Sequence, residues 1–111
     1  MNGEQQPKFV KIPAPPDLFG QNATITRRYR VPLWRMDGIR ASSTSGEVYN
    51  HLAALVPEWE NIRDVETDAE LPHPQTDSNV FGRLDAEQLG WISETFKLRA
   101  SDLKKLIITN R

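Results

Sequence analysis

Four prolines stand within the first 16 residues, and no other feature restricts the possible backbone of this chain as strongly. Each proline lacks an amide donor and holds φ near the polyproline value. Between Pro7 and Pro13 lies a short apolar segment with strand-forming residues. We therefore predict that residues 1–20 form an extended arm, attached to a single domain of residues 21–111. The arm is expected to dock on its own body or on a neighbouring molecule through its apolar side chains, Phe9, Ile12, Leu18 and Phe19.

Composition limits how such a chain can be stabilised. It has 111 residues and no cysteine, so neither a disulfide framework nor a thiolate zinc site can form. A hydrophobic content of 38% predicts a small hydrophobic core, whose stability depends in part on a neighbouring subunit.

No apolar run approaches the roughly 20 residues that span a membrane. The first residues also lack the charged and then apolar pattern of a signal peptide, so we expect neither a membrane span nor a signal peptide.

The middle of the chain predicts one strand and one helix. From Ala23 to Trp34 apolar and polar residues alternate, and Arg27 falls on the apolar side, which indicates an edge strand or a short one. Asp37-Gly38 is typical of a turn. Thr44 and Glu47 have the spacing of a capping box, and apolar residues then recur at helical spacing. We place this helix at residues 45–56.

The C-terminal third predicts a strand at residues 79–84 followed by two helices. Asp85 and Gln88 have capping-box spacing before the first helix, and Ser101 is a candidate cap for the second. The predicted fold class is therefore α+β. It combines a small antiparallel sheet, a central helix, a C-terminal helix-turn-helix pair and the extended proline-rich arm.

Charge is segregated along the chain, although the net charge is only −1. Residues 1–40 have a net charge of +4, residues 41–87 of −8, and residues 88–111 of +3. Surfaces of opposite sign can steer a partner and set its register, or they can be ordinary solvated faces. If they bind a partner, the candidate contact residues are Arg27, Arg28, Arg30 and Arg35 on the basic side and Glu58, Glu60, Asp64 and Glu66 on the acidic side.

Residues able to perform catalysis are not grouped in this sequence. His51 has no carboxylate or second histidine at helical spacing, and His73 lies between prolines in a loop. The carboxylates cluster in one run, and the six glycines are scattered without a phosphate-binding pattern. We therefore expect no catalytic residues, no metal ligands and no cofactor, and a protein that is not an enzyme.

The C-terminal helix pair leaves two further functions open. A DNA-binding helix-turn-helix would place the second helix in the major groove. Its phosphate contacts would come from Lys97, Arg99, Lys104 and Lys105. Asp102 at the start of that helix and the slightly acidic whole chain disfavour nucleic acid as a partner.

The second possibility is a family resemblance over about residues 79–108. It rests on Leu89, Ile92, Ser93, Phe96, Leu98 and the run Ser101-Asp102-Leu103-Lys104-Lys105-Leu106. Their spacing resembles the helical part of a lysin-motif (LysM) module, with Val80-Phe81 as its leading strand. The resemblance implies a glycan-binding fold, although the family's Gly-Asp-Thr turn is missing and no strand is predicted after the helices. Lys11-Ile12-Pro13 is similar to the family's closing strand, so we predict that residues 8–13 pair beside residues 79–84.

Taken together, these features favour a non-enzymatic structural or assembly subunit. Its partners would be other protein subunits, with copies of itself among them. Lysin-motif-like folds occur as structural modules in phage tails and baseplates, so the resemblance implies a virion component, and the expected location is a virion or the cytoplasm. This step is an analogy between folds. DNA binding and peptidoglycan binding are the two alternatives.

Overall fold

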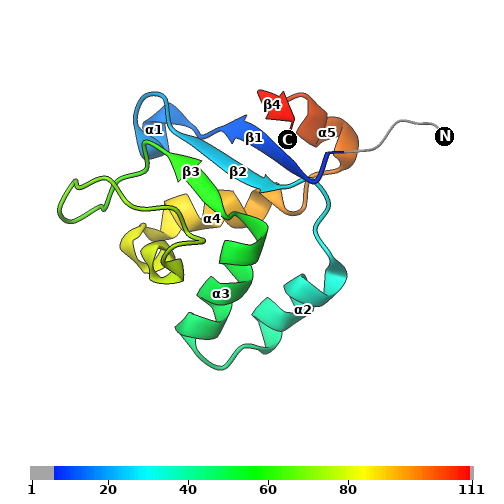
Figure 1. The fold of residues 1–111 in the computed structure, drawn as a ribbon, viewed down its shortest axis with the longest axis horizontal. Coiled ribbons are helices and arrows are strands. Elements are labelled where there is room, and N and C mark those ends of the chain that lie inside the picture. The colour runs from blue at the N-terminus through cyan, green and yellow to red at the C-terminus, as the bar shows by residue number, and fades with distance from the viewer. Residues whose placement is uncertain (1–6, 111) are drawn as a thin grey trace.

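The computed structural model describes residues 7–110, and it has the predicted α+β class (Figure 1). Four antiparallel strands form one sheet in the order β3-β2-β1-β4, so β3 and β4 are its edges. The elements in chain order are β1 (Phe9–Pro13), α1 (Pro16–Phe19), β2 (Thr24–Arg28), α2 (Leu33–Ala41), α3 (Ser45–Leu55), β3 (Glu58–Glu60), the 3-10 helix η1 (Ser78–Arg83), α4 (Ala86–Thr95), α5 (Ala100–Lys104) and β4 (Thr109–Asn110).

The segment predicted as a docking arm contributes a central strand. Along β1, Val10 and Ile12 are fully buried, while Phe9 and Lys11 alternate with them and are only half-buried. Ile12 pairs with Ile25 of β2 across the ladder. On its other side β1 pairs with β4, the short strand that follows the C-terminal helices. Residues 9–13 therefore lie inside this chain's own sheet.

Two strand predictions for this sheet are wrong. Residues 79–84 form no strand, because the Asp77 side chain accepts from the Asn79 amide and begins the 3-10 helix η1 there. Residues 8–13 consequently pair with β2 and β4 and not with residues 79–84. A strand does follow the helix pair, although none was predicted.

Within the segment from Ala23 to Trp34 the strand β2 has five residues and lies inside the sheet, so the predicted short strand is confirmed and the alternative of an edge strand is wrong. After Pro32 the chain enters α2, which includes Trp34 and the residues Asp37-Gly38 that were predicted as a turn. Gly38 serves close packing here, since a Cβ atom at this position would lie 2.5 Å from Nε2 of His51. The glycine that suggested a turn allows α2 to approach α3 within a helical hairpin (Figure 1).

The helices α3 and α4 agree well with their sequence signals. The predicted central helix is α3, whose Thr44 hydroxyl accepts from the Glu47 amide at 3.2 Å. The capping box predicted at Asp85 and Gln88 is complete at the start of α4. Two helix details differ from the prediction: the cap of α5 is Arg99 and not Ser101, and α1 forms a short helix within residues 1–20, which were predicted to be extended.

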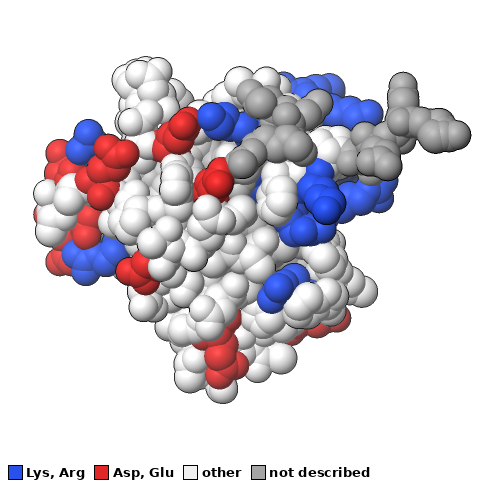
Figure 2. Space-filling view, in the orientation of Figure 1, with Lys and Arg blue, Asp and Glu red and all other residues white. Residues whose placement is uncertain are grey.

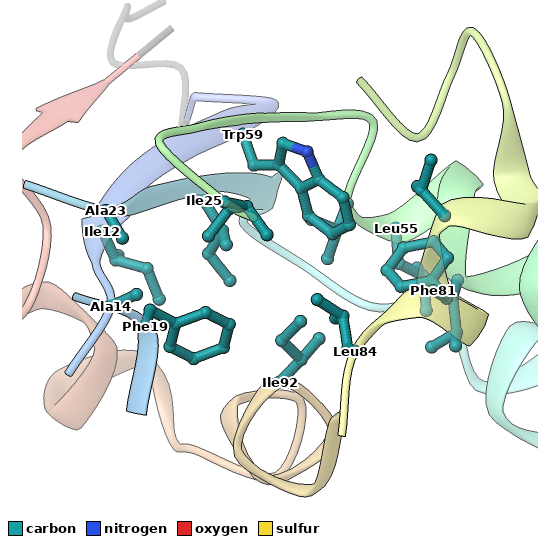
Figure 3. Close-up of a cluster of buried hydrophobic side chains, with 14 of the residues drawn as sticks. Ile12, Ala14, Phe19, Ala23, Ile25, Leu55, Trp59, Phe81, Leu84 and Ile92 are labelled. Carbon is teal, nitrogen blue, oxygen red and sulfur yellow. The ribbon is translucent and has the colours of Figure 1, made fainter. Parts of the chain in front are cut away.

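The core lies between one face of the sheet and the helices (Figure 3). Ile12 and Ile25 project from the central strands towards Ile92 of α4. Near β3 the ring of Trp59 packs edge-on against Phe81 of η1, with ring centroids 5.3 Å apart. Because the chain has no cysteine, this packing and the sheet ladder must supply its stability.

We predict that Ile12→Ala lowers the free energy of unfolding by about 2–5 kcal/mol, because it leaves a cavity at a fully buried position. Urea denaturation followed by tryptophan fluorescence would measure the loss. Leu33→Ala is the matched control, since Leu33 is 72% exposed and its loss should change stability by less than about 0.5 kcal/mol. Equal effects of the two substitutions would contradict the placement of β1 in the core.

Candidate functional site

Arg27 of β2 is the most unusual charged residue of the structure. Its side chain lies on the apolar side of the strand, as the alternation predicted, and only 2% of the residue is exposed. The guanidinium donates to the carbonyl of Thr95 at the end of α4, to the carbonyl of Arg28 at 2.8 Å and to that of Tyr29 at 3.4 Å. Within residues 7–110 it forms no ion pair with a carboxylate.

Burial lowers the pKa of the Arg27 guanidinium to about 10, so the group is still a cation at neutral pH. Its charge lies at the C-terminal end of α4, where the helix dipole and the last carbonyl favour a cation. The Phe96 ring, 5.4 Å from the guanidinium carbon, adds a cation–π contact. Arg27 was predicted as a surface contact residue, and it instead joins β2 to α4.

Beside Arg27 lies an open pocket of about 270 Å³, which we call the basic pocket. It combines two cationic residues with a tyrosine and apolar walls, and its lining residues are Arg27, Tyr29, Arg30, Val31, Phe96, Leu98, Ala100 and Leu103. The Tyr29 hydroxyl is buried and has no hydrogen-bond partner among residues 7–110. A space of this size is smaller than a drug-sized ligand site and suits one or two side chains.

A second charged feature is the acidic loop, which we define as residues 61–70. Its conformation depends on Asp64, whose carboxylate accepts from the amides of Glu66 at 2.8 Å and Thr67 at 3.2 Å. The same carboxylate accepts from Nε of Arg83 at 2.5 Å. Asp64 was predicted as an exposed contact residue, and it is instead buried and holds the loop in shape.

Electrostatics reinforce this arrangement. The hydrogen bond from Arg83, with the two backbone amides, lowers the pKa of Asp64 to about 2. The tip of the loop remains available to a partner, because Val65 is 50% exposed and the Glu66 side chain is 76% exposed. Figure 1 shows the loop projecting beyond β3 at the left of the molecule.

The two charged surfaces lie at opposite ends of the molecule. In Figure 2 acidic side chains gather at the left, around the acidic loop, with a few basic residues among them. Basic side chains gather at the right, where β2 ends and α5 lies. The charge segregation predicted along the sequence is therefore also a separation in space.

The remaining predicted contact residues have varied surroundings. Ile12 and Phe19 lie in the core, and Phe19 packs edge-on against Trp91 at 5.6 Å. Arg28 lies over the half-buried Phe9 ring, 5.6 Å from its centroid. The Leu18 carbonyl accepts a hydrogen bond from the Gln88 side chain. Glu58 is half-buried, and Glu60 forms an ion pair with Lys11 at 2.9 Å.

The sequence interpretation missed an exposed apolar surface at the start of α2. Leu33 is 72% exposed and Trp34 is 59% exposed, and α2 has no fully buried residue. Arg35 lies over the Trp34 ring at 4.1 Å and approaches Nδ1 of His51 at 3.2 Å. The signal that could have located this helix is the spacing of Leu33, Met36 and Ile39 directly after Pro32.

A larger cleft of about 410 Å³ lies between α1, α4 and the acidic loop. Its buried polar groups are already used within the chain: Gln88 bonds to Leu18 and Asp85, and Asp64 bonds to Arg83. Among residues 7–110 no group of three or more potential ligands is placed to hold a metal ion. In the same part of the chain no helix is long and apolar enough to cross a membrane.

Comparison with known proteins gave no match to a family model, to a curated protein or to a solved structure. The function of this chain must therefore be inferred from its own surfaces.

We predict that Arg27→Ala lowers the free energy of unfolding by about 2–4 kcal/mol, because it removes the guanidinium's hydrogen bonds to three backbone carbonyls and opens a cavity. Urea denaturation would measure the change. Arg99→Ala is the control, since the Arg99 side chain is exposed and, among residues 7–110, its ion pair is with Asp102 at the surface. A loss below about 1 kcal/mol at Arg27 would show that β2 and α4 are held together by other contacts.

A second prediction concerns acid stability. The folded-state pKa of Asp64 lies below its ordinary value of 3.8, so its contribution is present above about pH 4 and is lost as pH falls towards 2. Asp64→Asn should therefore flatten the fall in stability between about pH 4 and pH 2. Arg83→Gln should flatten it too, because it removes the main cause of the low pKa. Urea denaturation at several pH values tests this, and wild-type slopes in both variants would contradict it.

Proposed function

We propose that this protein is a non-enzymatic structural or assembly subunit that acts by binding other protein subunits, with copies of itself among them. The observation that carries the proposal is the exposed pair Leu33 and Trp34 at the start of α2. Tryptophan and arginine are the residues that most often anchor protein interfaces. Here Trp34 and Arg35 lie stacked beside each other on a helix that packs along α3.

Charge supports the same class of function. An acidic end and a basic end on one small molecule favour defined orientations when subunits meet, and they disfavour others. A virion tail or baseplate is the assembly that the lysin-motif resemblance implies, and we keep it as the particular form of the proposal.

Of the two alternatives, DNA binding has the weaker support. α5 would be the recognition helix, and it has only five residues with Asp102 in its first turn. Glycan binding rests on the lysin-motif resemblance, whose leading strand would be Val80-Phe81, a segment that lies in η1. The exposed surface of α2 therefore makes protein binding the preferred function.

The proposal predicts that the chain elutes from an extract of its producing cells in a particle much larger than its own 12.7 kDa. Leu33→Ser with Trp34→Ser should shift it towards the mass of a single chain, because the change removes the apolar anchor. Size-exclusion chromatography with immunodetection would measure the mass, and circular dichroism would confirm folding.

Leu106→Ser is the matched control, since Leu106 is an exposed leucine outside α2. It should leave the particle unchanged. Elution of the wild-type chain as a single 12.7 kDa molecule would overturn the proposed function.

A further inference from the structure

The basic pocket has the properties of a receptor for an acidic side chain. Arg27 lines it as a buried cation, and within residues 7–110 its guanidinium donates to neutral backbone carbonyls. A buried charge without an opposite charge is costly, and an anion placed beside it reduces that cost. Arg30 adds a second cation to the lining.

Its walls also select for an apolar group next to the anion. Val31, Phe96 and Leu98 supply the apolar part of the lining. The complementary occupant is therefore a short segment that presents an aliphatic side chain beside a carboxylate. Burial of one aliphatic side chain contributes about 1.5–3 kcal/mol, and the carboxylate adds orientation.

The acidic loop of the same protein is such a segment. At its tip the half-exposed Val65 precedes Glu66, whose carboxylate is exposed. The contact of Glu66 with Arg83 is a surface ion pair, which contributes little and can be exchanged for another. Because Asp64 already orders the loop, docking would require little further loss of conformational entropy.

Loop and pocket lie at opposite ends of the molecule, so they meet only between two copies (Figures 1 and 2). We propose that the Val65-Glu66 tip of one copy inserts into the basic pocket of the next copy. This contact joins two different surfaces, so it repeats head to tail and generates a ring or an open chain. The inference rests on the proposed function, and it names a second copy of the chain as a partner.

Two complementary variants test the contact directly. Val65→Ser with Glu66→Lys removes the docking tip and leaves the pocket intact, whereas Arg30→Glu with Leu98→Glu blocks the pocket and leaves the tip intact. All four positions are exposed, so both variants should fold. Charge-matched controls at exposed sites outside both surfaces are Glu87→Lys and Arg40→Glu.

Sedimentation velocity of the purified proteins at about 50 mM and about 500 mM salt would give the result. The wild-type chain and both controls should associate as concentration rises, with affinity about tenfold or more weaker at the higher salt. Each variant alone should be monomeric. An equimolar mixture of the two variants should form dimers and nothing larger, because one intact tip and one intact pocket remain.

Three outcomes would overturn the inference: variants that associate like the wild type, a mixture that stays monomeric, and a wild-type chain that stays monomeric up to about 1 mM. None of these outcomes would contradict the proposed function. That function is tested separately, by the mass of the particle in the extract and by the Leu33 and Trp34 substitutions. Association that depends on Trp34 but not on Glu66 or Arg30 would leave the proposed function standing and reject the head-to-tail contact.

Discussion

The arrangement of this protein depends on one buried cation, Arg27, which joins the central sheet to the end of α4. The guanidinium donates to the carbonyl that closes α4, so the first sheet strands and the C-terminal helices are held by a charge–dipole contact. No disulfide can perform this role, because the chain has no cysteine. The cost of desolvating Arg27 is visible in its lowered pKa, and its three carbonyl contacts and the Phe96 ring offset that cost.

A second charged pair organises the opposite end of the molecule. Asp64 and Arg83 hold the acidic loop in one conformation, and Glu66 and Val65 remain exposed at its tip. At both ends, then, a buried charged residue stabilises the fold, and exposed charged residues lie near it. This division explains how a molecule with a net charge of −1 presents two surfaces of opposite sign, and it is the basis of the head-to-tail contact proposed above.

The predictable parts of the structure are those whose causes are local. α3 and α4 begin where Thr44 and Asp85 satisfy free amides, and their apolar spacing could be recognised in the sequence. The partners of β1 could not be predicted, because strand pairing joins residues far apart in the chain and the alternation of β1 fits several neighbours. α2 was missed because Gly38 suggests a turn by itself, and its close approach to His51 exists only after folding. Of the proposed contact residues, Arg30 and Glu66 were identified from charge, whereas Val65, Leu98 and Trp34 were not.

The sequence by itself determined the α+β class, the capped helices, the absence of disulfides and the alternating charge of successive segments. Each of these follows from composition or from residues a few positions apart. Only the tertiary structure decided which charges are buried and which are free: Arg27 and Asp64 look like their neighbours Arg28 and Glu66 in the sequence, yet the first two are enclosed by the fold. Burial depends on what distant segments pack over a side chain, and that packing is a property of the folded chain as a whole.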